Sequence, residues 1–204
     1  KTFFKDIVFF EKEFGGIMPL EIMIDTKKEK GVMKLATLKK IEKLNDAIEL
    51  IPDLSQPISI NNLVKYSKQA FYNGNPKYFQ LPTSQEKVFL LKYLKNSESS
   101  TNSLKNIVDA TGRYARITTY MKDVGTDKME RIQERLQAVI DKEFKSNAYE
   151  VTLTGKALVF LRGTTYLINN LVISLSLAIF LISLFMGWMF RSMRMILVSL
   201  IPNL

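Results

Sequence analysis

Cysteine and histidine are both absent from the 204 residues. Without cysteine the chain has no disulfide and no thiolate nucleophile, and without histidine it has no imidazole base. The common zinc ligand sets need one or both of these residue types, so they are excluded too. A Ser-His-Asp triad is excluded for the same reason. We therefore expect this chain to be no enzyme and to hold no cofactor and no metal.

Charge is nearly absent from the last fifth of the chain. Residues 164–204 contain no Asp or Glu, and they hold only Arg191 and Arg194 of the 29 basic residues. The other 27 basic side chains precede residue 164 and exceed the 20 acidic ones there by 7. Such a surplus can attract nucleic acid or an anionic membrane, but these lysines are spread over several predicted helices with acids between them. We interpret the surplus as a solvated surface and expect no nucleic-acid partner.

An uncharged run of 28 residues, 163–190, is the strongest signal in the sequence. Its inner part, 171–190, is long enough as a helix to span about 30 Å, the thickness of a bilayer's hydrocarbon core. A soluble core helix is seldom apolar on every face, so the run predicts a transmembrane helix. Small residues along it favour close packing against neighbouring helices in a bundle. They are Ser174, Ser176, Ser183 and Gly187.

A four-residue segment with two arginines, 191–194, separates this run from a second apolar run that begins at residue 195. The positive-inside rule places this turn in the cytoplasm and the large domain outside. Pro202 and Asn203 in the second run are tolerable where neighbouring helices satisfy the backbone. We therefore expect a multi-pass protein in the lipid bilayer. The N-terminus has neither an initiating Met nor a signal peptide, which indicates an internal start.

Before the membrane run, two hydrophobic periodicities alternate along the chain. Apolar residues at every second position predict strands at 19–26, 114–122 and 149–155, and a short extended piece predicts another at 54–58. A further short strand candidate lies at 104–108, before a predicted turn at 109–112. Spacings of three and four predict helices at 3–14, 35–51, 60–71, 84–94 and 127–144, with a polar loop at 96–103. Helix caps are predicted at Ser59, at Thr83 with Glu86, and at Asp127 with Glu130.

The resulting order is strand, helix, strand, two extra helices, strand, helix, strand. Two amphipathic helices on one face of a four-stranded, mostly antiparallel sheet form an α+β sandwich of the ferredoxin-like kind, with the two central helices inserted. The expected parts are a linking helix from a preceding membrane span (1–16), the α/β domain (17–155), a helix entering and spanning the membrane (156–190), the cytoplasmic turn (191–194) and the start of the next transmembrane helix (195–204).

Few side chains before the membrane run combine into a recognisable site. Glu21 and Asp25 lie on one strand and are interpreted as surface groups rather than an acid/base pair. Four aromatic residues surround the loop at 73–82, and two interpretations of them stay open: contact with an amphiphilic substrate, or cover for the domain's own core. These candidate substrate-contact residues are Phe71, Tyr72, Tyr78 and Phe79.

Several segments, in this order and spacing, resemble the resistance-nodulation-division (RND) exporters, and among them the MMPL-type branch. The segments are FFEKEFGGIMPLEIMIDT near the start, DATGRYARITTYMKD, YEVTLTG, and FRSMRMILVSLIPNL at the end. The resemblance covers essentially the whole chain. It implies a porter-type fold, with this chain as the second extracytoplasmic domain, the membrane helix that follows it, and the start of the next one.

The resemblance also implies a function: proton-driven export of hydrophobic or amphiphilic molecules, such as lipids, hopanoids or drugs, from the bacterial inner (cytoplasmic) membrane. The expected partners are the bilayer, the remaining membrane helices and first porter domain of the same protein, and the substrate; a homo-oligomer stays open. Proton-coupling acids are expected outside this chain, because residues 164–204 have none. The alternative is a membrane-anchored extracytoplasmic ligand-binding sensor or adaptor domain, which sequence beyond Leu204 would distinguish.

Overall fold

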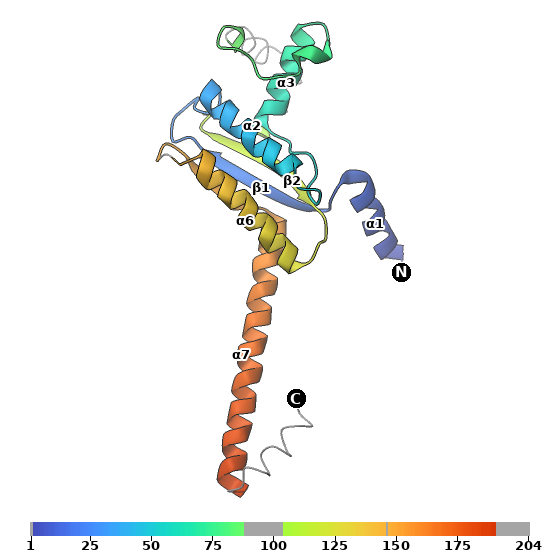
Figure 1. Cartoon of the computed structure of the whole chain (residues 1–204), viewed down its shortest axis with the longest axis vertical. Coiled ribbons are helices and arrows are strands. Elements are labelled where there is room, and N and C mark those ends of the chain that lie inside the picture. The colour runs from blue at the N-terminus through green and yellow to red at the C-terminus, as the bar shows by residue number, and fades with distance from the viewer. Residues whose placement is uncertain (1, 88–103, 146, 191–204) are drawn as a thin grey trace. The chain divides into compact units, whose positions relative to one another are not determined.

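The computed structural model describes residues 2–87, 104–145 and 147–190 (Figure 1). The chain divides into two units, residues 1–159 and 160–204, and each is described by itself. The first unit combines a small three-stranded antiparallel sheet with helices, which confirms the predicted α+β class. The second unit holds most of a long C-terminal apolar helix.

The central strand of the sheet is β1 (Met18–Asp25), which pairs antiparallel with β2 (Tyr114–Met121) on one side and with β3 (Glu150–Thr154) on the other. In this register Ile22 lies opposite Ile117 of β2 and Leu153 of β3, and all three are buried. The alternation predicted for the first and third strands is confirmed, because every second residue of β1 and β2 points into the core.

A segment at 53–58 follows the outer edge of β2 without forming a regular strand. The Ile58 N–H donates to the Thr118 carbonyl at 2.8 Å, and the Thr118 N–H donates back at 3.0 Å. Only isolated bridges result, since Pro57 has no N–H to contribute to a ladder. The prediction of a regular fourth strand here was therefore wrong, although the segment does lie beside the sheet.

The strand candidate at 104–108 was also wrong. Residues 104–105 are helical, the Val108 N–H turns back to the Leu104 carbonyl, and only Val108 bridges to Ala115 of β2. A turn held by local hydrogen bonds has replaced the extended backbone, because the chain must reverse within a few residues to enter β2. The turn predicted at 109–112 is present.

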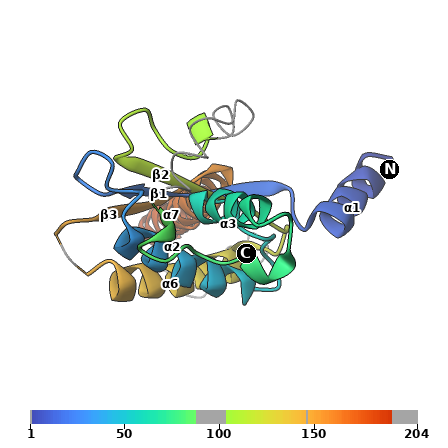
Figure 2. The ribbon, with the colours of Figure 1, turned by 90° about the horizontal axis from the view of Figure 1, so that it is seen from above.

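Two helices, α2 (Leu35–Glu49) and α6 (Thr126–Glu143), lie side by side on one face of the sheet (Figure 2). Each buried aliphatic side chain at this interface contributes about 1.5–3 kcal/mol to folding. The predicted Asp127–Glu130 capping box is not formed, because α6 begins after Gly125 and Asp127 lies within its first turn. The residues buried under the helices are Leu38, Ile41, Leu44 and Ile48 of α2, and Met129, Ile132, Leu136 and Ile140 of α6.

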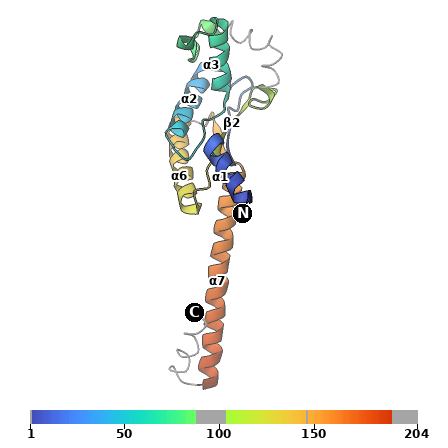
Figure 3. The ribbon, with the colours of Figure 1, turned by 90° about the vertical axis from the view of Figure 1, so that its right-hand side faces the viewer.

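The inserted segment begins with α3 (Ile60–Phe71), whose N-cap is Ser59 as predicted; the capping box that Ser59 forms with Asn62 was not predicted. The first turn of α3 is bonded to α2, where the Asn61 side chain donates to the Leu38 carbonyl at 2.8 Å. The C-terminal part of α3 leads into the short 3-10 helix η1 (Pro76–Tyr78), seen beyond α2 in Figure 3. Residues 86–87 are helical, within the range 84–94 predicted for the second inserted helix; the rest of that range lies outside the described residues, as does the loop predicted at 96–103.

The first helix, α1 (Thr2–Phe14), ends at Gly15 and Gly16 as predicted. A side chain at Gly16 would meet the Met121 backbone, since a Cβ there would lie 2.7 Å from the Met121 carbonyl carbon. The Glu11 carboxylate accepts from the Asp123 N–H at 2.6 Å, so α1 is bonded to the chain just after β2.

The C-terminal helix α7 (Lys156–Phe190) begins two residues after β3 ends. Its stretch Lys156–Met189 is long and apolar enough to cross a membrane, and no other helix in the described ranges is. This length and composition indicate membrane association. Gly155, between β3 and α7, has φ +106°, and a Cβ there would lie 2.6 Å from the Pro19 carbonyl oxygen. The turn predicted at 191–194 and the run from 195 lie outside the described residues.

Candidate functional site

Five aromatic rings gather around the C-terminal half of α3 and the loop after it; we call Tyr66, Phe71, Tyr72, Tyr78 and Phe79 the aromatic cap. The chain reverses here through Asn73 and Gly74, both with positive φ. Asparagine and glycine tolerate this left-handed conformation better than other residues. Asn75 then caps η1 by accepting from the Lys77 N–H at 3.0 Å. Local turn chemistry therefore returns Tyr78 and Phe79 to α3.

The rings of the aromatic cap pack against one another in three pairs. Tyr72 and Tyr78 stack with centroids 4.0 Å apart and planes 12° apart. Tyr66 with Phe79, at 4.8 Å, and Phe71 with Tyr72, at 5.4 Å, meet edge to face. Such pairs add about 0.5–1.5 kcal/mol beyond the burial of their area. Despite this packing, Tyr66, Phe71 and Phe79 remain 60%, 43% and 39% exposed.

A buried ion pair joins α3 to the far end of this loop. Lys68, only 2% exposed as a residue, donates from its ammonium to the Glu86 carboxylate at 2.9 Å. Glu86 also accepts from the Thr83 N–H at 2.8 Å and from the Tyr72 hydroxyl at 3.1 Å. We call Lys68, Tyr72, Thr83 and Glu86 the latch. Its bonds tie residues 72–86 into one closed loop over α3.

The electrostatics of the latch follow from these contacts. The Thr83 N–H, together with the Lys68 ammonium and the Tyr72 hydroxyl, lowers the pKa of the Glu86 carboxyl to about 2 although burial opposes this. Burial raises the pKa of the Tyr72 hydroxyl, and the Glu86 carboxylate beside it raises that pKa further. The latch is therefore a fixed carboxylate–ammonium pair at neutral pH, without a group poised to exchange a proton.

A second polar cluster lies where β1 ends and β2 begins. Arg113 donates two parallel hydrogen bonds to Asp25, from Nε at 2.7 Å and from Nη2 at 2.6 Å. The Arg113 guanidinium lowers the pKa of the Asp25 carboxyl to about 2, and this pairing raises the pKa of Arg113. Asp25 is only 7% exposed, so its interpretation as a surface group was wrong. A partner 88 positions away in sequence makes its burial possible.

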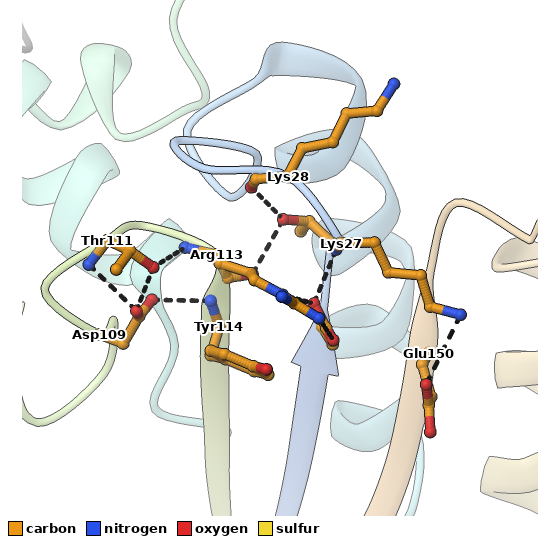
Figure 4. Close-up of polar contacts among 9 residues, drawn as sticks. Lys27, Lys28, Asp109, Thr111, Arg113, Tyr114 and Glu150 are labelled. Atoms are coloured by element: carbon orange, nitrogen blue, oxygen red, sulfur yellow. Dashed lines mark hydrogen bonds and ion pairs between the residues drawn. The ribbon is translucent and has the colours of Figure 1, made fainter.

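The turn before β2 is organised by Asp109 (Figure 4). Its carboxylate accepts from the Thr111 N–H at 3.0 Å, from the Thr111 hydroxyl, and from the Tyr114 N–H at 2.7 Å. Burial raises the pKa of Asp109, but the bonds from Thr111 and the backbone outweigh it and lower that pKa. Lys27 pairs with Glu150 of β3 at 3.6 Å in the same view. Every acid in this cluster has a partner, which fits a role in joining the strand ends.

A groove of about 440 Å³ lies beside the end of α6 and the start of β3. Lys27 and Lys145 line it together with Asp141 and Glu150, so its charges are mixed. Among the residues that the structure describes, no cluster of acids could hold a metal ion. These observations leave the aromatic cap as the strongest candidate for contact with another molecule.

No family matches. The chain matches no protein-family model and no curated protein. The resemblance to RND exporters therefore stays a prediction.

The four predicted substrate-contact residues all lie in the aromatic cap, where Phe71 meets Tyr72 and Tyr72 stacks on Tyr78. Phe79 joins them through Tyr66, which the prediction missed. The Thr83–Glu86 cap was predicted and is present, but its bond to Lys68 was not foreseen. Whether the cap touches a substrate stays a prediction.

Proposed function

We propose that this chain is the extracytoplasmic porter domain, with its following membrane helix, of a proton-driven RND-type exporter of hydrophobic or amphiphilic molecules. The observation that carries the proposal is the chain path: the last strand of an α+β domain is joined by Gly155 to a helix of membrane-spanning length. In an export domain this direct connection would let movement in one part reach the other.

The arrangement of the sheet supports a ferredoxin-like porter fold. Across it, the neighbours run as segment 53–58, β2, β1 and β3. This is the order that a strand–helix–strand unit followed by a second such unit adopts when both helices cover one face. The helices α2 and α6 each connect the first and second segments of such a unit. In this proposal, α3 and the loop after it are an insertion between the units.

Membrane topology is the first test. The 204 residues contain no cysteine, so a cysteine placed at Asn75, in the exposed turn before η1, is unique within this chain. In the full-length protein, freed of other cysteines, a membrane-impermeant maleimide should label Asn75→Cys in intact cells. A cysteine at Ser192, in the predicted cytoplasmic turn, should be labelled only after the cells are opened. The reverse pattern would rule out the proposed orientation.

Export is the second test. Cells that produce the full-length protein should lose a preloaded lipophilic dye such as Nile red faster than cells with an empty vector. A protonophore should abolish that difference. If neither dyes nor lipids leave faster, while a ligand instead changes the state of a cytoplasmic output domain, the sensor alternative is the correct one.

A further inference from the structure

The loop between β1 and α2 carries a dense set of positive charges. Residues 27–34, which we call the basic loop, contain four lysines and one acid, Glu29. All four lysines are exposed, and Lys27 pairs with Glu150 at 3.6 Å. The other three have no ion-pair partner in the part of the chain that the structure describes; they are Lys28, Lys30 and Lys34.

The acids at the neighbouring strand ends are already engaged. Asp25 holds the Arg113 guanidinium through two hydrogen bonds. Asp109 accepts from backbone N–H groups of its own turn. Neither carboxylate is left to neutralise the three unpaired lysines of the basic loop.

The backbone of the basic loop is fixed by hydrogen bonds. The Lys30 N–H donates to the Thr111 carbonyl at 3.0 Å, which joins the loop to the turn before β2. The buried Thr26 hydroxyl donates to the Lys28 carbonyl at 3.0 Å. Figure 4 shows the Lys28 side chain extending away from this cluster. The lysines therefore project from a preorganised base, which lowers the entropy cost of docking a partner.

Two of these lysines have backbone conformations that lysine rarely adopts. Lys27 and Lys30 have φ of +52° and +55°, and among the described residues only Asn73 is a further non-glycine residue with positive φ. Glycine would adopt these angles without strain. Residues held in such conformations cluster at functional sites, so lysine at both positions indicates that the charge is used and not only the turn.

The place of the basic loop in the domain bears on the kind of partner. The start of α7 lies beside the start of β1, since a Cβ on Gly155 would lie 3.1 Å from the Leu20 Cα. Five residues of strand, about 16 Å, separate Leu20 from Asp25 at the other end of β1. The basic loop follows Asp25, so it lies away from the point where the chain enters the helix of membrane-spanning length. This favours a partner in water over the head groups of the bilayer.

Glu29 distinguishes between two kinds of anionic partner. A uniform polyanion such as polyphosphate gains only from cations and is repelled by a carboxylate placed among them. A protein segment can place its acids at the lysines and a basic or polar side chain at Glu29. The mixed charge of the basic loop therefore favours a protein.

We propose that the basic loop docks an acidic segment of another protein through ion pairs to Lys28, Lys30 and Lys34. The inference goes beyond the proposed function, because it assigns a protein–protein contact surface that does not depend on export.

The test uses the full-length protein in phosphatidylcholine nanodiscs and a short fluorescein-labelled peptide in which glutamate alternates with serine. Fluorescence anisotropy measures its affinity, and the same peptide with glutamine in place of glutamate should not bind. A carbodiimide then joins carboxylates to the ammonium groups they contact, and mass spectrometry identifies the linked lysines. Linkage should be several-fold more frequent in the basic loop than at Lys77, an exposed lysine of η1.

Removal of charge from the basic loop separates docking from general attraction. Lys28→Gln/Lys30→Gly/Lys34→Gln should weaken binding roughly tenfold, since each exposed ion pair contributes a factor of up to about five. Glycine at position 30 adopts the positive φ without strain, so the loop should keep its shape. The matched control removes three exposed lysines from other elements and should change the affinity less than twofold; its substitutions are Lys5→Gln, Lys77→Gln and Lys142→Gln.

Equal linkage at the basic loop and at the control lysines would overturn the proposal, as would equal loss of affinity in the two triple variants. Tighter binding of polyphosphate than of the acidic peptide, through the same lysines, would assign the loop to an anionic polymer. Protection of these lysines by phosphatidylglycerol nanodiscs without peptide would assign it to the bilayer. Carbodiimide linkage to an acid of the same chain would show that the protein itself supplies the counter-charge.

Discussion

Replacing Lys68 by Met should loosen the loop of residues 72–87 without unfolding the domain. Methionine keeps the length and apolar stem of the side chain but removes the ammonium that bonds Glu86 at 2.9 Å. The rest of the latch keeps the Thr83 and Tyr72 bonds to Glu86. The perturbation thus removes the hydrogen bond to Glu86 and a longer one, 3.4 Å, from the same buried ammonium to the Leu81 carbonyl.

The size of the effect follows from burial. A hydrogen bond between charged groups contributes about 1.5–3 kcal/mol, and Lys68 is almost fully buried while Glu86 retains some solvent contact. We expect Lys68→Met to lower the free energy of opening the loop by about 2 kcal/mol, which raises the population of the open loop about 30-fold. Glu86→Gln should cost more, since it leaves a buried ammonium without its counter-charge.

Hydrogen–deuterium exchange on the full-length protein in nanodiscs measures this directly. Peptides covering 72–87 should exchange faster in Lys68→Met, while peptides from β1 keep the exchange rate of the unmodified protein. Lys77→Met is the control, because Lys77 is an exposed lysine of the same loop that forms no ion pair within the described residues. Its exchange should be unchanged.

The double variant tests the physical reason. In Lys68→Met/Glu86→Gln neither charge is left unpaired, so the loop should open less often than in Glu86→Gln alone. Exchange in Lys68→Met within twofold of the unmodified protein would refute the reasoning. So would a double variant in which the two single effects simply add.

Four further outcomes are expected. The pKa of Glu86 is lowered from 4.5 to about 2, so the latch should stabilise the loop fully above about pH 4.5 and lose this stabilisation as the pH falls toward 2. The rate of pepsin cleavage within residues 72–87 at stepped pH measures the loss. Arg113→Met should leave the buried Asp25 carboxylate without its guanidinium and lower the stability of the domain by about 2–3 kcal/mol, seen as a lower urea midpoint; Arg131→Met, on the exposed side of α6, should not. Gly155→Ala should disturb the start of α7 by about 1–3 kcal/mol, since alanine is strained at φ +106° and its Cβ meets the Pro19 carbonyl; Gly74→Ala, also at positive φ but with open space around it, should cost less in the same unfolding experiment. Leu177→Arg in α7 should reduce membrane insertion by about 2.5–3.5 kcal/mol in a translocon assay, whereas Leu177→Ile should not.

Much of the aromatic cap could be predicted from local sequence. Phe71, Tyr72, Tyr78 and Phe79 are close along the chain, and the Asn-Gly turn between them brings two chain segments together. The latch could not be predicted in full. Glu86 was correctly expected to cap a helix, but its bond to Lys68 depends on how far the loop folds back, which no short motif specifies.

The irregular parts of the sheet show the same limit. Alternation placed the buried residues of β1 and β2 correctly, because side-chain period depends only on backbone geometry. The two short strands predicted without alternation are not regular strands: a turn is needed before β2 at 104–108, and Pro57 interrupts the ladder at 54–58. Strand pattern alone does not say which hydrogen bonds a neighbouring segment can supply.

The helix of membrane-spanning length near the C-terminus was determined by the sequence itself. An uncharged stretch of twenty mostly apolar residues is unfavourable in water whatever it packs against, and the structure has one helix from Lys156 to Phe190 there. The burial of Asp25 was decided only by the tertiary structure, because its partner Arg113 arrives from a distant turn through the pairing of β1 with β2. Hydrophobicity is a property of a segment, whereas a buried charge is stable only where the fold supplies its counter-charge.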